Sequence, residues 1–254
     1  MPGTGLLVED ARPEGRGGCA NVPRVIPDRS APLLRTAWPV LAASALLSLW
    51  FAWRVPLIDP DEGRNAEVAR EMAADGDVVV PHLAGLPYLD KPPALFAAGA
   101  LAVKAFGANR IAVRLPAIVA SLVTLWLLAR AARRLAPARG TTGRGLDADV
   151  TLLAATAPLF APLAAYVIFD MPLAACVTAV WTGVALEVAT GRSNGRRAAM
   201  FAAVALGVLL KGPVMLLWAV GGSALNSGVS GPGNGWFDRA RLSSRSSRSR
   251  STLR

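Results

Sequence analysis

The sequence predicts an all-α, polytopic membrane protein, and two observations favour that class. First, 53% of the residues are hydrophobic and only 17% are charged, with a mean hydropathy of +0.42; soluble domains carry about 25% charged residues. Second, the apolar residues gather into uncharged runs that approach or reach the roughly 20 residues needed to cross a bilayer. These runs are residues 37–53, 115–129, 150–169 and 171–186. We expect one membrane-spanning helix from each run.

Two further apolar segments are less regular. Residues 198–225 are interrupted by Lys211, Gly212 and Pro213, a pattern that fits either one kinked helix or two short ones. Residues 94–106 are too short for an untilted crossing and suit an interfacial or re-entrant helix.

The arginines give the predicted orientation. Three blocks of them flank the predicted membrane helices, before residue 37, over residues 130–144 and over residues 192–197. Because cytoplasmic loops are enriched in Lys and Arg, all three blocks belong on the cytoplasmic side. A crossing by residues 94–106 would place the second block outside. We therefore expect residues 54–114 to form one external loop, with Asp170 facing the same side.

The ends of the chain differ from its middle. Residues 1–31 are rich in Pro, Gly and Arg and are predicted to be a disordered cytoplasmic tail. Residues 226–254 form a Ser/Arg/Gly-rich tail that lacks the apolar residues of a core. The middle, residues 32–225, is the predicted transmembrane region. Its first apolar run begins too late for a signal peptide, which indicates an uncleaved anchor.

The net charge of +10 could indicate binding to nucleic acid, but the positions of the aromatic residues argue against it. Aromatic side chains lie inside the apolar runs and do not alternate with arginines as in nucleic-acid-binding surfaces. The sequence therefore excludes nucleic acid and favours membrane lipids as partners. Cys19 and Cys176 are too few and too far apart for a disulfide framework or a zinc cluster.

Residues 59–93 concentrate charge between apolar segments. Asp59, Pro60 and Glu62 fit an N-cap, a first helical residue and a capping box, which leaves Asp61 without a capping role. The helix is expected to lie on the membrane surface and to end at Gly76. Its i,i+3 pairs are Asp61–Arg64 and Glu67–Arg70.

Four polar residues lie near the predicted outer surface. Three of them have both a structural and a functional interpretation, and the fourth, His82, has no predicted function. Lys91 either holds a phosphate or extends its ammonium to the interface. Asp170 separates two apolar runs, which is costly unless it faces water, a cation or a partner, or forms the polar tip of a hairpin. Lys211 is either an interfacial lysine or a cation facing a polar cavity. His82 has no partner spacing for a metal ligand and is expected at the surface.

Six short motifs occur in order over residues 57–218. They are D-E-x-R-x-A-E-x-A-R-E-M-x-x-x-G-D, P-x-x-x-G-x-P-Y-x-D-K-P-P, F-G-x-N, A-x-R-L-P, D-M-P-L and K-G-P. The set resembles polyprenyl-phosphate-dependent membrane glycosyltransferases of the GT-C fold. Bacterial protein O-mannosyltransferase homologues and the 4-amino-4-deoxy-L-arabinose transferases of lipid A are the members it resembles most.

The resemblance implies roles for individual residues. Asp61 matches the catalytic aspartate of the first external loop, which accepts or orients the proton of the acceptor hydroxyl. Lys91 matches the lysine that contacts the carrier phosphate, Asp90 its acidic neighbour, and Asp170 a second acidic residue near the reaction centre. Further candidates for substrate contact are Glu62, Arg64 and Lys211. No cofactor is required; a divalent metal ion can bridge carboxylate and phosphate, but the spacing does not demand one.

The implied activity is an inverting transfer of a sugar from a polyprenyl-phosphate carrier to a lipid, glycan or protein hydroxyl. It takes place on the outer face of the cytoplasmic membrane. The family has Tyr, Trp and Asn where this chain has Asn65, Val78 and Ala84, and Tyr-Trp in place of Phe96-Ala97. Relatives are about twice as long, so we expect an N-terminal portion of such an enzyme. The alternative is a non-catalytic protein that binds the carrier lipid or acts as a scaffold; a transporter is disfavoured because no repeat of broken helices is evident.

Overall fold

A computed structural model describes residues 36–136 and 145–229, the last eight by their backbone alone. The described part is mostly helical, which confirms the all-α prediction. The helices are α1 (Trp38–Arg54), α2 (Asp61–Asp75), α3 (Ala94–Phe106), α4 (Arg110–Leu135), α5 (Leu146–Ala155), α6 (Phe160–Leu163), α7 (Asp170–Thr190), α8 (Asn194–Lys211) and α9 (Val214–Val229). A two-stranded hairpin, β1 (His82–Leu83) and β2 (Leu86–Pro87), lies between α2 and α3.

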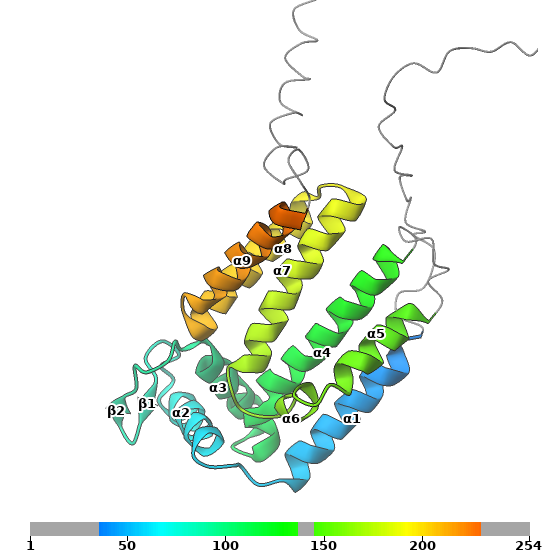
Figure 1. Ribbon diagram of the computed structural model, residues 1–254. Helices are drawn as coiled ribbons and strands as arrows, with labels where there is room; N and C mark the ends of the chain where they lie inside the picture. The colour runs from blue at the N-terminus through cyan, green and yellow to red at the C-terminus, as the bar shows by residue number, and fades with distance from the viewer. Residues whose placement is uncertain (1–35, 137–144, 230–254) are drawn as a thin grey trace, which may run out of the picture.

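The long helices run up and down a common axis, as Figure 1 shows. The chain descends in α1, ascends in α4, descends in α5, ascends in α7, and then descends and ascends in α8 and α9. The segment with α2, the hairpin and α3 gathers at one end, here called the loop end; the opposite end, which carries Arg130 to Arg134 and Arg192 to Arg197, is the arginine end. This arrangement places residues 55–109 between α1 and α4 at one end of the bundle, and residues 94–106 do not run its length. Residues 110–114, which the prediction included in the loop, instead form the first turn of α4.

Two helices are long and apolar enough to cross a membrane by themselves, α4 with 26 residues and α7 with 21. The open question about residues 198–225 is answered by two antiparallel helices that turn at Gly212 and Pro213. Gly212 has φ 70°, a conformation that favours glycine, and proline cannot continue the preceding helix. Helix α9 reaches Val229, which lies within the segment predicted to be a tail. The rest of both predicted tails, and Cys19, lie outside the described residues.

The prediction of one long helix over residues 150–169 is wrong. Helix α5 ends at Ala155, α6 is a single turn, and the chain then continues without regular structure to Asp170. Pro158 and Pro162 provide the physical reason, since proline removes a backbone donor and clashes with the preceding turn. The interruption leaves Tyr166 and Val167 in a non-helical segment at the loop end, beside α2.

The predicted start of the loop helix is also wrong, although its end is confirmed. Helix α2 begins at Asp61 after Pro60, and no side chain caps it. Glu62 Oε2 instead accepts a hydrogen bond from the backbone N–H of Ile58, at 2.9 Å. Gly76 ends the helix with φ 82°, as its position predicts.

A core at the loop end joins the external helices to the bundle. The buried residues come from α2, α3, α7, α8 and α9: Val68, Met72, Leu95, Phe96, Ala100, Phe169, Leu173, Cys176, Leu210 and Met215. Helices α2 and α3 approach so closely that a Cβ atom at Gly99 would lie 2.9 Å from the Cβ of Ala69. The apolar face of α2 therefore covers α3, and protein contacts hold the loop helices in place.

Candidate active site at the loop end

A buried ion pair anchors the start of α2. Glu62 and Arg114 are both fully buried, and their side chains meet at two points. Arg114 Nη2 lies 2.7 Å from Glu62 Oε2, and Arg114 Nε lies 2.7 Å from Glu62 Oε1. Two parallel hydrogen bonds of this kind fix the relative position of both groups.

The remaining hydrogen-bonding capacity of this pair is also used. Arg114 donates to three carbonyl oxygens at the end of α1, those of Ala52 (3.2 Å), Val55 (2.7 Å) and Pro56 (2.9 Å). Glu62 accepts additionally from the backbone N–H groups of Val167 (3.2 Å) and Ile58 (2.9 Å). The Arg114–Glu62 pair thus ties α1, α2, α4 and the segment before α7 together.

These contacts bear on both predicted roles of Glu62. Its carboxylate does not form the predicted capping box. Protein donors contact both of its oxygens, which argues against the predicted contact with substrate. Sequence reasoning placed Arg114 in a motif but assigned it no role. The available signal was a charged residue at the start of an apolar run, which requires a partner.

Asp61 has the opposite environment. Its side chain is 57% exposed and forms the predicted pair with Arg64, whose Nη2 lies 2.6 Å from Asp61 Oδ1. Successive helical residues point about 100° apart, because an α-helix has 3.6 residues per turn. Burial of Glu62 therefore directs Asp61 toward the open side of the loop end. The Nε of Arg64 is buried and has no hydrogen-bond partner among the described residues.

Two tyrosines lie within electrostatic range of Asp61. Burial is the main cause that raises the pKa of Tyr88 and of Tyr166, and the negative charge of Asp61 raises both further. Both phenols therefore keep their protons at neutral pH. Tyr88 donates its hydroxyl proton to Asp90 Oδ2, at 3.2 Å.

An aromatic row connects the two acidic positions that the sequence singled out. The ring of Tyr88 packs edge-on against Phe96, with centroids 6.0 Å apart, and Phe96 packs in the same way against Phe169 at 5.3 Å. Such edge-to-face pairs hold their rings in defined positions. The row runs from the neighbourhood of Asp90 to the residue before Asp170.

Asp170 and Lys211 form a pair across 41 positions of sequence. Lys211 Nζ lies 2.5 Å from Asp170 Oδ1, and both side chains are partly exposed. Of the interpretations left open, the structure selects the one in which Asp170 faces a cation. Asp170 is the first residue of α7 and Lys211 the last of α8, so the pair closes the loop end of these two helices.

Lys91 lies in the turn before α3. Its Nζ is 3.8 Å from Asp90 Oδ2, and the two side chains are 43% and 60% exposed. This loose contact leaves the ammonium free to receive a further anion. His82 is half-buried in β1, in contrast to the surface position expected. Within residues 36–136 and 145–229, His, Cys, Asp and Glu side chains form no group of three or more that could hold a metal ion.

An apolar cavity of about 610 Å³ lies between α3, α4, α7 and α8. We call it the bundle groove. Its lining includes Ala94 and Leu95 at the start of α3 and Leu210 near the end of α8. The groove is therefore apolar along its length, and Lys91 and Lys211 lie one to three residues from its lining in the sequence. This arrangement matches a ligand with an anionic head and an apolar tail.

Comparison with known proteins agrees with this geometry. Residues 90–222 match the family described as dolichyl-phosphate-mannose-protein mannosyltransferase, which covers more than half of the chain. The chain belongs to this family. Its membership confirms the resemblance to polyprenyl-phosphate-dependent enzymes of the GT-C fold.

Named relatives and solved structures match this chain over only part of their own length. The undecaprenyl phosphate-alpha-4-amino-4-deoxy-L-arabinose arabinosyl transferase of Edwardsiella ictaluri is 32% identical over 165 residues, which is 62% of this chain and 29% of that protein. The crystal structure of ArnT from Cupriavidus metallidurans in the apo state has a TM-score of 0.59 at 32% identity, covering 75% of this chain and 35% of that one. The same protein bound to undecaprenyl phosphate has a TM-score of 0.62 at 31% identity, covering 72% and 34%. This chain thus spans about a third of the length of these relatives.

Proposed function

We propose that this chain forms the carrier-binding part of a membrane glycosyltransferase that uses a polyprenyl-phosphate-linked sugar. The bundle groove with Lys91 and Lys211 at its loop end carries the proposal, because it fits a prenyl chain and a phosphate at once. Undecaprenyl phosphate is the ligand bound to the related ArnT structure, which supports the same class of donor here.

Lys91 is the residue we assign to the phosphate. Its ammonium is partly exposed and only loosely held by Asp90, so it can pair with an incoming phosphate oxygen. A cation at this position stabilises the negative charge that grows on the phosphate as the sugar leaves. Lys211 is a second cation at the loop end, but Asp170 pairs with it and compensates its charge.

Asp61 is the residue we assign to the acceptor. In the proposed step the acceptor hydroxyl oxygen bonds to the anomeric carbon, the bond from that carbon to the phosphate oxygen breaks, and its electron pair stays on the phosphate. The hydroxyl proton passes to Asp61, a partly exposed carboxylate that Arg64 orients. Attack opposite the leaving phosphate inverts the anomeric configuration.

The sugar and the acceptor remain broad classes. The relatives' names specify 4-amino-4-deoxy-L-arabinose, and the family's description specifies mannose. We propose a pentose or hexose donor and a lipid, glycan or protein hydroxyl as acceptor. Glu62 is excluded from substrate contact in this proposal, whereas Arg64 remains within it through its pairing with Asp61.

Carrier binding and sugar transfer are tested separately. Polyprenyl phosphate binding to the purified chain in detergent should fall on Lys91→Ala and persist on Asp61→Asn. Transfer of a radiolabelled sugar in membranes should be lost on Asp61→Asn. Wild-type transfer by that variant would contradict the catalytic assignment. Binding without any transfer by the chain itself would favour the second candidate, a non-catalytic carrier-binding protein.

We also propose that the loop end faces the exterior of a cytoplasmic membrane. The arginines of the opposite end carry this proposal, since cytoplasmic segments retain positive charge. Single cysteines at Leu89, which is 77% exposed at the loop end, and at Arg192, at the arginine end, would test it after replacement of the two native cysteines. An impermeant thiol reagent should label only the first in intact cells. Labelling of the second alone would reverse the orientation.

A further inference from the structure

The arginine end contains two kinds of arginine. Arg133 and Arg197 pair with buried carboxylates: Arg133 Nε lies 3.6 Å from Asp147 Oδ2, and Arg197 Nε lies 3.5 Å from Glu187 Oε1. These pairs join α4 to α5 and α7 to α8. Their charges are thus compensated within the protein.

Among the half-buried arginines at this end, three have no carboxylate partner within the part of the chain that the structure describes. They are Arg130 and Arg134 of α4 and Arg196 of α8. Arg134 follows Arg130 by one helical turn on the same face of α4, and Arg196 lies within electrostatic range of Arg130. A cluster of like charges that protein acids do not neutralise attracts an anion.

The side chains in this cluster are held in place. The guanidinium of Arg130 lies 5.6 Å from the ring centroid of Trp126. Arg196 donates to the carbonyl oxygen of Gly191 at 3.0 Å and to Thr190 Oγ1 at 3.2 Å, so it is fixed against the end of α7. Arginine in a fixed orientation recognises phosphate through its planar set of donors.

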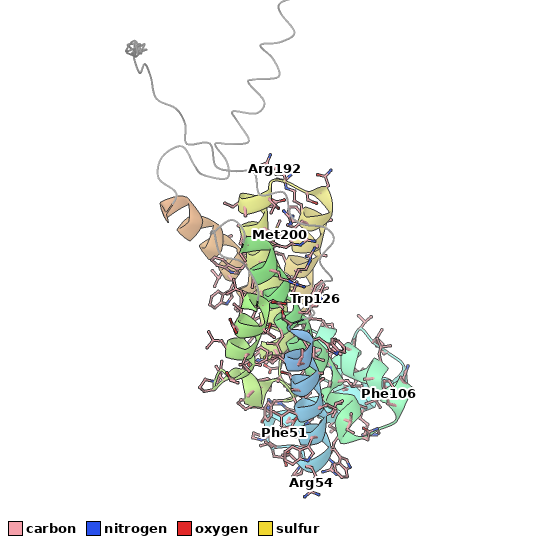
Figure 2. All side chains as sticks on the ribbon, turned by 90° about the vertical axis from the view of Figure 1, so that its right-hand side faces the viewer. Phe51, Arg54, Phe106, Trp126, Arg192 and Met200 are labelled. Carbon is pink, nitrogen blue, oxygen red and sulfur yellow. The ribbon has the colours of Figure 1, made fainter. Side chains whose placement is uncertain are left out.

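The cluster lies beyond the bundle groove along α4, where Val119 and Val123 line both that groove and a second apolar cavity against α1 that also includes Trp126. Pro116, Val119 and Val123 line the groove from α4, and the spacing of three or four residues that keeps side chains on one helical face leads on to Trp126, Arg130 and Arg134. On α8 the face with Leu210, Leu206 and Ala203 leads in the same way to Arg196. Figure 2 shows the order along the bundle, with Arg54 at one end, Trp126 in the middle and Arg192 at the other end.

We infer that Arg130, Arg134 and Arg196 form a binding site for the phosphate of an anionic phospholipid in the cytoplasmic leaflet, with one acyl chain lying in the adjoining part of the bundle groove. Charge complementarity and the apolar wall beside the cluster argue for a lipid of the bilayer. The headgroup position is separate from the loop end, because Arg130 lies 14 residues beyond Pro116, about 21 Å along a helix that rises 1.5 Å per residue.

The test measures preference for phosphatidylglycerol over phosphatidylcholine in reconstituted bilayers. Each lipid carries brominated acyl chains, which quench tryptophan fluorescence at contact. Because the chain has seven tryptophans, the signal of the site is the difference between wild type and Trp126→Phe. We expect quenching to favour phosphatidylglycerol in the wild type. The double variant R130Q/R134Q, which spares the contacts of Arg196 with α7, should lower that preference roughly 25-fold, since each arginine near an anionic headgroup contributes about a factor of five.

The matched control is R110Q/R192Q, which removes two exposed arginines outside the cluster. It should keep the preference within about a factor of two. Equal loss in both double variants, no preference in the wild type, or displacement of the lipid by inorganic phosphate would each overturn the inference. Loss of Trp126 quenching on formation of a dimer would do the same, since a second copy would then fill the groove. If R130Q/R134Q does not fold, Arg134→Gln alone should lower the preference about fivefold, and an unchanged preference in that variant would overturn the inference too.

Discussion

Asp61 and Glu62 are neighbours in the chain, yet their carboxylates have opposite surroundings. Glu62 is fully buried against Arg114, and its oxygens receive four hydrogen bonds. Asp61 is largely exposed and pairs only with Arg64 one turn along the same helix. The difference shows that one helix start supplies both an anchor and a reactive group, because adjacent side chains leave the helix about 100° apart.

The anchor should dominate stability. Glu62→Ala or Arg114→Ala leaves an unpaired charge in the interior, and we expect a loss of about 3–5 kcal/mol in the free energy of unfolding. Denaturant titration in mixed micelles measures it. Asp61→Ala is the matched control and should stay within about 0.5 kcal/mol. Similar losses at positions 61 and 62 would show that the two sites do not differ as the structure indicates.

Lys91, on the exposed side of the loop end, should have the largest effect on carrier binding. Lys91→Ala is expected to weaken polyprenyl phosphate binding by about 1.5–3 kcal/mol, the contribution of a hydrogen bond to a charged group. Lys104→Ala is the control, because Lys104 is an exposed lysine in the last turn of α3. A titration calorimeter or a lipid-binding assay in detergent measures both. Equal effects of the two substitutions would reduce Lys91 to an ordinary interfacial lysine.

A single substitution in the turn of the β1–β2 hairpin should stabilise the protein. Ala84 and Gly85 both have positive φ, 54° and 74°, which two-residue hairpin turns of this type require and which Asn-Gly sequences favour. A non-glycine residue without a short polar side chain adopts this conformation at a cost of about 1–2 kcal/mol. Ala84→Asn should therefore stabilise the protein by about 1 kcal/mol. Thermal unfolding should show a higher midpoint, and Ala84→Val should lower it.

The smallest effect is expected at the pair that closes the loop end. Asp170 and Lys211 are both partly exposed, and exposed ion pairs contribute about 0.2–1 kcal/mol. Asp170→Asn should change the unfolding free energy by no more than this, and less at high salt. A loss above about 2 kcal/mol would show that the Asp170–Lys211 pair stabilises the fold as a buried pair does, like Glu62–Arg114.

Several local features followed from the sequence. The ion pairs of α2, its end at Gly76 and the extent of α3 agree with the structure, since helical spacing and glycine or proline punctuation act over a few residues. The placement of α2 and α3 at one end of the bundle and of the arginines over residues 130–134 and 192–197 at the other also agrees, whereas the first arginine block and residues 137–144 lie outside the described residues. Local patterns failed where two signals competed: apolar composition over residues 150–169 suggested a long helix, but Pro158 and Pro162 interrupt it.

The sequence by itself therefore determined the class of fold, the end of α2, the extent of α3 and the family to which the motifs point. Tertiary structure alone decided which charges meet between different helices. Arg114 reaches Glu62 across 52 positions, and Lys211 reaches Asp170 across 41. The pattern around each residue does not reveal such partners, because they depend on which helices pack side by side. For the same reason, only packing separates Asp61, open to chemistry, from Glu62, enclosed in the anchor.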